Sequence, residues 1–379
     1  MSTAVQPSTA GVPRQPMPVS PMLVRRAAVL GAGTMGSRIA AHLANAGIPT
    51  LLLDLVPEGE GDRSRLAKAA LEALAKAKPA AFYEAAGAAL VTPGNFEDDL
   101  AKLAGCDWVI EAVAENLAIK TALLERVLPY LAPQAVLTTN TSGLPVKQIA
   151  AGLASHKSRF FGTHFFNPPR YMRLLEIIPG PETDADVLAS FAAFADRNLG
   201  KQIVFANDTP NFIANRIGVA VMFTAAALMM EQGLTIEEVD ALTGSAIGWP
   251  RTGTFRLADL VGIDVLAHVA ANFPAGGASH GGLGEVLKEM VQRGWLGDKV
   301  GQGFYKKKQE RRQGRTACAR PRDLRVPPSG QASAACARNG QECRNGAGAA
   351  ETAARQRSGQ GQGGEVSLAV SFFVVELCR

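Results

Sequence analysis

Short apolar runs alternate with longer amphipathic stretches over residues 24–207, and this alternation predicts a doubly wound α/β domain. Runs such as AAVL, PTLLLD and DWVIEAV have the length of buried strands, and each is followed by apolar residues at helical spacing. Between the second and third of these runs, Pro93 and Gly94 predict a turn. Asp208 and Pro210 predict the start of a long helix. From there, apolar residues recur at helical spacing to about residue 268 without strands. We therefore expect a Rossmann-like parallel sheet over residues 24–207, followed by a smaller, all-helical domain over residues 208–305.

The longest apolar run, residues 217–230, favours a buried helix over a membrane span. It is shorter than the ~20 residues that a bilayer requires, and Arg216 and Glu231 bracket it. Residues 1–23 are rich in Pro, Ser, Thr and Ala and contain no acidic residue. They lack the basic start and apolar block of a secretory signal, so we expect a disordered leader, with a transit peptide as the alternative.

Positive charge is concentrated near the C-terminus. Residues 306–379 hold 14 of the 39 Lys and Arg residues but 6 of the 34 Asp and Glu residues, which leaves 25 against 28 in the remainder. The formal charge of +5 is thus poor evidence that the folded body binds nucleic acid. Four of the five cysteines also lie there, and no CxxC spacing indicates a metal site. A reducing compartment, the cytoplasm, is the simplest expectation.

Hydrophobic periodicity stops after GQGFYKKK, and a basic, low-order tail over residues 306–379 follows. A natural disordered extension is one interpretation of this composition. A shift of reading frame near Lys308 in a GC-rich gene is the interpretation that we favour, because it explains the sudden excess of Arg and Cys.

The stretch GAGTMG, between an apolar run and a helical stretch, is typical of a dinucleotide-binding turn. Gly31, Gly33 and Gly36 allow a tight turn, close approach of a pyrophosphate and close packing of helix on strand. Asp54 ends the next strand, eighteen positions after Gly36, where a carboxylate can meet ribose hydroxyls. That charge would repel a 2′-phosphate, so NAD is favoured over NADP. A structural turn with a solvated Asp54 is the alternative.

Polar residues follow the next two predicted strands. Glu111 and Glu115 come at the end of one strand, and Asn140, Thr141 and Ser142 at the end of the other. Ligands of a parallel sheet bind beyond the carboxyl ends of its strands, so Ser142 and Glu115 are expected near a nicotinamide and its substrate. Asn-Thr-Ser is also ordinary turn chemistry.

The stretch FFGTHFFNPPRYMRLLEII predicts two strands joined by a turn at Pro168 and Pro169. His164 lies on the first strand, and Glu176 follows twelve residues later on the second. An imidazole can take and return a proton near neutrality, and a carboxylate beside it can orient the ring and stabilise its charged form. His164 is therefore a candidate catalytic base; a hydrogen-bonded core histidine is the alternative.

Several blocks occur in the order found in the L-3-hydroxyacyl-CoA dehydrogenases of fatty-acid β-oxidation, and the chain resembles that family over residues 24–307. The blocks are GAGTMG, VIEAVAEN, TTNTSGLP, GTHFFNPPRYMRLLEII, NDTPNFIANRIG, ADLVGID and GQGFYKK. The resemblance is strongest to the bacterial branch in which an enoyl-CoA hydratase domain follows on the same chain; no such domain is recognisable here.

The resemblance implies NAD-dependent oxidation of L-3-hydroxyacyl-CoA to 3-ketoacyl-CoA. His164 would take the 3-hydroxyl proton, and Glu176 would hold and polarise the imidazole ring of His164. Ser142 and Asn215 would form hydrogen bonds with the substrate. The implied contacts to NAD come from Gly31, Gly33, Thr34, Met35, Gly36, Asp54, Glu115, Lys120, Asn167 and Lys299.

The family's CoA-binding helix should correspond to residues 63–78, whose length differs from the best-known members. This stretch is rich in alanine and carries five basic residues, Arg63, Arg65, Lys68, Lys76 and Lys78. Such charges usually form a solvated face, and phosphates of a CoA ester are the alternative partner. We assign no CoA ligand here.

Two other functions remain open from the sequence. A β-hydroxyacid dehydrogenase also couples a Rossmann domain to a helical one, but it normally relies on a catalytic lysine. An inactive scaffold could instead bind a partner or nucleic acid through the basic tail. The apolar helical domain makes a homodimer an expectation, and no metal is expected.

Overall fold

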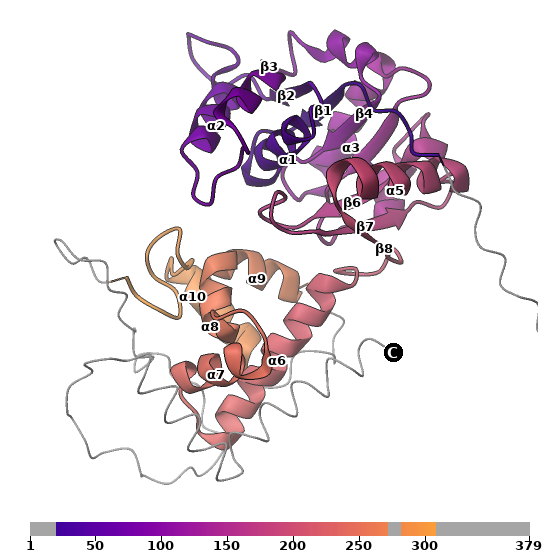
Figure 1. Ribbon diagram of the computed structural model, residues 1–379. Helices are drawn as coiled ribbons and strands as arrows, with labels where there is room; N and C mark the ends of the chain where they lie inside the picture. The colour runs from indigo at the N-terminus through magenta and orange to yellow at the C-terminus, as the bar shows by residue number, and fades with distance from the viewer. Residues whose placement is uncertain (1–19, 272–281, 308–379) are drawn as a thin grey trace, which may run out of the picture. The chain divides into compact units, whose positions relative to one another are not determined.

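The computed structural model describes residues 20–271 and 282–307, which fall into two compact units that meet in sequence between Thr209 and Pro210 (Figure 1). The first unit holds the sheet and the second is helical.

The first unit is built on one eight-stranded sheet in the order β3-β2-β1-β4-β5-β6-β7-β8. The pairs from β3 to β6 are parallel, β7 is antiparallel to β6, and β8 is parallel to β7. The strands are β1 (Ala27–Leu30), β2 (Thr50–Asp54), β3 (Val91–Asn95), β4 (Trp108–Glu111), β5 (Val136–Thr139), β6 (Phe160–Phe165), β7 (Leu174–Pro179) and β8 (Gln202–Phe205).

Helices connect these strands and cover the sheet. They are α1 (Thr34–Asn45), α2 (Arg65–Ala75), α3 (Leu117–Val127), α4 (Val146–Ala151) and α5 (Ala185–Leu199). Side chains of α1 and α5 share one core cluster with the strands, in which the rings of Phe191 and Phe194 pack edge-on against Trp108. Helix α4 contacts β6 and α3. The predicted Rossmann-like fold is confirmed.

One predicted turn in this unit is wrong. Pro93 and Gly94 suggested a turn, but both lie inside β3. Strand β3 is at the edge of the sheet, where a proline can be tolerated because one side of the strand needs no ladder hydrogen bonds.

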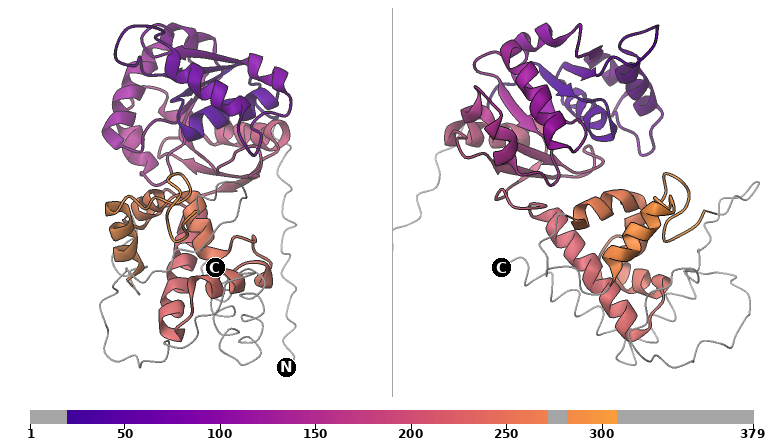
Figure 2. Two further views of the ribbon diagram at one scale, coloured as in Figure 1. Left: turned by 90° about the vertical axis from the view of Figure 1, so that its left-hand side faces the viewer. Right: turned by 180° about the vertical axis from the view of Figure 1, so that it is seen from behind.

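The second unit is all-helical within its described residues, as predicted. Its helices are α6 (Ala214–Gln232), α7 (Ile236–Leu242), α8 (Gly253–Val261), α9 (Ile263–Ala271) and α10 (Leu283–Gln292). Helices α9 and α10 pack on each other and on α6 (Figure 2). Their common core includes Phe223, Val239, Phe255 and Leu287.

Helix α6 is, among the described residues, the one helix long and apolar enough to cross a membrane by length and composition. That evidence is weak, because core helices of globular units pass the same test. Val219, Val221, Met222, Phe223, Ala225 and Ala226 of α6 belong to the core of the second unit.

The start of α6 differs from the sequence prediction. Asp208 and Pro210 were expected to begin a long helix, but Asn211 and Phe212 have positive φ values of 63° and 48°, and the helix begins only at Ala214. Asp208 instead accepts hydrogen bonds at 2.8 Å from the backbone N–H groups of Val146 and Lys147, at the start of α4.

The GQGFYKK segment is fastened to the second unit by two buried aspartates. Asp259 accepts hydrogen bonds from the backbone N–H groups of Phe304 (2.7 Å) and Tyr305 (2.8 Å). Asp240 accepts one from the Tyr305 hydroxyl at 2.7 Å. Burial raises the pKa of Asp240 to about 6, although the hydrogen bonds that its own carboxylate accepts, the one from Tyr305 among them, act to lower it. The predicted leader, except for residues 20–23, and the predicted tail beyond Lys307 lie outside the described residues.

Candidate active site

The glycine turn between β1 and α1 is shaped by its own backbone. Gly31 has φ +105°, and a Cβ on Gly36 would collide with the Gly31 carbonyl oxygen, so both positions require glycine. A Cβ on Gly33 would meet nothing within 4 Å, which leaves the surface above this residue open. Thr34 and Met35 form the first turn of α1, whose free N–H groups favour an anion. These residues fit the pyrophosphate of a dinucleotide.

Asp54 ends β2 beside this turn. Its Oδ2 accepts a hydrogen bond from the Ala32 N–H at 2.6 Å, and its Oδ1 accepts one from the Leu55 N–H at 2.7 Å. The carboxylate is therefore held against the turn, where the sequence analysis expects it to meet a ribose. The role of Asp54 itself stays a prediction.

His164 and Glu176 face each other across the β6–β7 ladder. The antiparallel register pairs the two residues directly, and His164 Nδ1 lies 2.7 Å from Glu176 Oε2. Their exposed fractions are 5% and 1%. A neutral imidazole that donates Nδ1–H to the carboxylate keeps its lone pair on Nε2, the atom that can then accept a proton.

Two further residues hold the segment that carries His164, and the sequence analysis missed this role for both. Asn140 Oδ1 accepts a hydrogen bond from the Phe165 N–H at 2.9 Å. The Lys201 ammonium donates to the carbonyl oxygens of Pro169 and Met172, in the turn between β6 and β7. Burial lowers the pKa of Lys201 to about 8. A lysine at the start of an apolar strand was the available signal.

Glu115 organises the loop after β5. Its Oε1 accepts hydrogen bonds from Thr141 Oγ1 (2.7 Å), Ser142 N (2.7 Å), Ser142 Oγ (3.1 Å) and Gly143 N (3.0 Å). Burial alone would raise the pKa of Glu115, but the Lys120 charge and these hydrogen bonds outweigh it and lower the pKa. Glu115 and Ser142, predicted from separate strand ends, are therefore direct neighbours.

The other predicted cofactor contacts lie in different settings. Lys120 is fully buried and pairs with Glu111 and Glu115. Asn167 is exposed in the turn after β6. Asn215, in the first turn of α6, and Lys299, paired with Asp264, belong to the second unit. The roles of Asn215 and Lys299 stay predictions.

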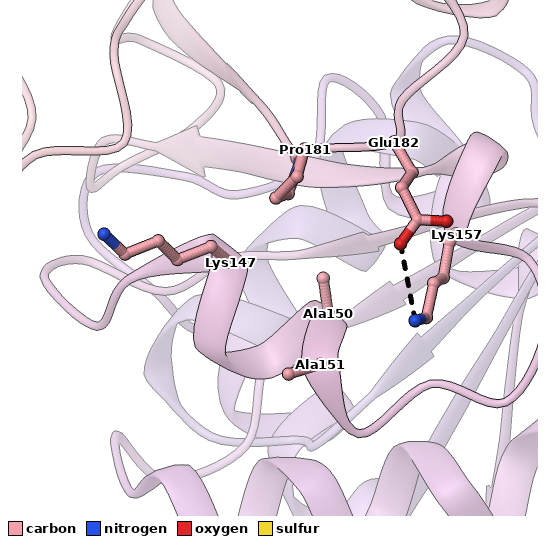
Figure 3. Close-up of a pocket in the computed structure, with 7 residues that line it drawn as sticks. Lys147, Ala150, Ala151, Lys157, Pro181 and Glu182 are labelled. Atoms are coloured by element: carbon pink, nitrogen blue, oxygen red, sulfur yellow. Dashed lines mark ion pairs between the residues drawn. The ribbon is translucent and has the colours of Figure 1, made fainter.

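A pocket of about 280 Å³ lies apart from these residues, beside α4 and the segment after β7 (Figure 3). Lys157 Nζ is 3.4 Å from Glu182 Oε1 at its rim. Its lining contains no predicted site residue: Lys147, Ala150, Ala151, Lys157, Gly180, Pro181 and Glu182. In the described part of the chain, no group of His, Cys, Asp and Glu side chains could hold a metal ion.

Comparison with protein families decides the class of the chain. The NAD-binding domain of 3-hydroxyacyl-CoA dehydrogenase matches residues 26–209, and the C-terminal domain of the same enzyme matches residues 212–307. The chain belongs to the 3-hydroxyacyl-CoA dehydrogenase family. It is accordingly an NAD-binding oxidoreductase of that class, which displaces the β-hydroxyacid dehydrogenase alternative.

Individual relatives agree with this membership. The chain is 48% identical over 306 residues to a probable 3-hydroxyacyl-CoA dehydrogenase of Deinococcus radiodurans, covering 79% of this chain and 86% of that protein. It is 46% identical over 305 residues to one of Bacillus subtilis, covering 75% of this chain but 38% of the longer relative.

Solved structures share the fold. The crystal structure of Mycobacterium tuberculosis FadB2 matches with a TM-score of 0.64 and 32% identity, over 75% of this chain and 99% of that one. A 3-hydroxybutyryl-CoA dehydrogenase of Escherichia coli matches with a TM-score of 0.62 and 30% identity, over 77% and 61%.

Proposed function

We propose that the chain oxidises L-3-hydroxyacyl-CoA to 3-ketoacyl-CoA in fatty-acid oxidation, with His164 as general base and Glu176 as the residue that orients it. The observation that carries this proposal is the 2.7 Å contact between His164 Nδ1 and Glu176 Oε2 within a family-matched NAD domain. When bound, NAD accepts the hydride that leaves C3 of the substrate.

In this mechanism His164 Nε2 takes the proton of the 3-hydroxyl group. The ring becomes positively charged, and the buried Glu176 carboxylate stabilises that charge because little water screens the pair. Ser142 and Asn215 would donate hydrogen bonds that hold the substrate oxygen in line. The glycine turn and Asp54 would bind the cofactor. Alignment of the substrate C3 with the nicotinamide carbon that receives the hydride would supply much of the rate.

The names of relatives support the substrate class and the process. The chain is 38% identical to a putative fatty acid oxidation complex trifunctional enzyme of Rickettsia felis, and 34% identical to a 3-hydroxybutyryl-CoA dehydrogenase of Mycobacterium tuberculosis. The homodimer and the cytoplasmic location remain expectations; analytical ultracentrifugation would measure the oligomeric state and fractionation the location.

Purified protein should reduce NAD when given an L-3-hydroxyacyl-CoA, and His164→Ala should lower kcat by ~10²–10⁴-fold with NAD binding retained. Absorbance of the reduced nicotinamide measures the rate, and calorimetry measures NAD binding. His156→Asn is the matched control, since His156 has φ 63° and asparagine tolerates that conformation. Full activity of the His164 variant would reject the assignment of the base.

A further inference from the structure

Three charged side chains, two of them buried and the third partly buried, form a chain next to the Ser142 loop. Glu111 and Lys120 have no exposed surface. Lys120 Nζ is 2.8 Å and 3.0 Å from the two carboxylate oxygens of Glu111, and 3.3 Å from Glu115 Oε2. One ammonium group therefore joins the carboxylate of Glu111, at the end of β4, to that of Glu115, four residues later.

Glu111 is held independently of the lysine. Its Oε1 accepts a hydrogen bond from the Val113 N–H at 2.7 Å, and its Oε2 accepts one from Thr139 Oγ1 at 2.5 Å. Glu111 ends β4 and Thr139 ends the neighbouring β5. The rigid sheet thus fixes the carboxylate of Glu111, which in turn fixes the position of the lysine ammonium.

Glu115 uses its two oxygens differently. Its Oε2 faces Lys120, and its Oε1 accepts the four hydrogen bonds from the loop at residues 141–143. The lysine therefore sets the direction in which the other oxygen points. The position of Ser142 depends on that direction, because both its N–H and its hydroxyl donate to this oxygen.

Stability alone does not explain this arrangement. Burying two charges carries a desolvation cost, and well-packed apolar residues of similar volume often stabilise a fold equally well or better. What the charged chain adds is direction: each member restricts the geometry of the next. We propose that Glu111 is a positioning residue that acts through Lys120 and Glu115 to hold Ser142 for the reaction. This inference rests on the proposed function.

The first test is Glu111→Gln, which keeps the side-chain shape and removes one acceptor and the charge. Lys120 would then be drawn towards Glu115, and Oε1 of Glu115 would leave part of its bonds to the loop. We expect kcat for hydroxyacyl-CoA oxidation to fall by ~10-fold or more, because a small misplacement of a substrate-holding group is costly. Unchanged kcat would overturn the proposal.

A double-mutant cycle separates positioning from general damage. If Glu111 acts through Ser142, Glu111→Gln should lower kcat by less than about 2-fold when Ser142 is already alanine, since the two effects are not additive. Equal losses in both backgrounds would mean that Glu111 does not act through Ser142, and the proposal would fail.

An apolar replacement keeps the proposal falsifiable if the glutamine variant folds poorly. In Glu111→Leu/Lys120→Met no charge of the inner pair remains, so the variant should fold, with a melting temperature lowered only by the lost acceptor of the Val113 N–H and the Thr139 hydroxyl. Because Glu115 still loses its anchor, kcat should remain ~10-fold or more below the wild type. Recovery of full kcat together with stability would reject positioning.

Arg126→Gln is the matched control. Arg126 lies on α3, the same helix as Lys120, and pairs with Glu97 at 2.8 Å, but both side chains are about half exposed. Its kcat should equal that of the wild type. If the wild type itself fails to oxidise hydroxyacyl-CoA, the proposed function and this inference both fall; an active wild type with a normal Glu111 variant removes only the inference.

Discussion

Glu176 is the residue whose replacement tests the catalytic pair without deleting it. Glu176→Gln keeps the shape of a side chain that is 1% exposed, but its amide can no longer neutralise a charged His164 ring. We expect kcat to fall by ~10²-fold or more, as for other bases that lose an orienting carboxylate, with NAD affinity unchanged. Steady-state kinetics and calorimetry measure the two quantities.

Glu182→Gln provides the control for that substitution. Glu182 follows the same strand, β7, and its side chain is 63% exposed. The control should retain the wild-type kcat. An unchanged kcat in the Glu176 variant would show that the buried carboxylate has no part in the reaction.

The buried His42, on α1, makes the folded chain less stable at acid pH. Burial above all, and the Lys201 charge, lower its pKa from 6.5 to about 3, against a backbone contact with Leu199. Below pH 6.5 the unfolded chain binds a proton that the folded chain does not, so stability falls as the pH drops from 6.5 towards 3. His42→Leu removes this effect. Between pH 6.5 and about 5, the free energy of unfolding of the wild type should fall by about 1.6 kcal/mol more than that of the variant. Urea titrations at several pH values measure it, and parallel curves would contradict it.

At the residue scale, the sequence predicted contacts between side chains that are close along the chain. His164 and Glu176 were paired because a turn between two strands brings them together, and the ladder register shows that pairing directly. The hydrogen bonds of the side chains of Asn140, Lys201 and Asp208 were not predicted. Each of them bonds backbone groups more than twenty residues away, and such partners leave no pattern in the sequence.

At the element scale, two glycines of the β1–turn–α1 unit are needed for different reasons, Gly33 for cofactor binding and Gly36 for packing. Gly33→Ala adds a Cβ that meets nothing in the protein, at an extended backbone conformation that any residue adopts. Gly36→Ala adds one that collides with the Gly31 carbonyl. We expect the Gly33 variant to keep its melting temperature and bind NAD at least ~10-fold more weakly, because the methyl group occupies space needed by the pyrophosphate.

The Gly36 variant should show the opposite order of effects. Its melting temperature should fall by several degrees, since the overlap forces α1 away from β1. Thermal unfolding without NAD distinguishes the two variants. Equal losses of stability in both would mean that Gly33 is also needed for packing.

Element prediction succeeded where the hydrophobic pattern was strong and failed where local chemistry was ambiguous. The buried strands β1, β2 and β4 were legible as apolar runs. Strand β3 was missed because Pro93 and Gly94 are ordinary turn residues, and only the position of β3 at the sheet edge makes them acceptable.

At the scale of the whole molecule, the change from alternating strands and helices to helices alone predicted two architectures in one chain. The structure has the sheet before Thr209 and helices after Pro210. The hydrophobic pattern determines which architecture each segment adopts, because each element must bury one face. The pattern carries no information on how two such units are placed, since that depends on side chains at a few surface positions.

Deletion of residues 308–379 tests what the basic tail contributes. The family match ends at Lys307, and the segment before it is closed by the bonds to Asp259 and Asp240 and by the Lys307 N–H bond to the Gly301 carbonyl at 2.9 Å. We therefore expect the shortened chain to keep its NAD-dependent activity and, within about 2 °C, its melting temperature.

The deletion removes 12 of the 39 Lys and Arg residues and 6 of the 34 Asp and Glu residues, so the formal charge changes from +5 to −1 and any affinity for polyanions should disappear. Deletion from Gly303 onward is the matched comparison. It removes the Phe304 and Tyr305 N–H donors from Asp259 and the Tyr305 hydroxyl from Asp240, and it should lower the melting temperature by several degrees. Equal stability of the two shortened chains would show that the GFYKK segment does not close the helical unit.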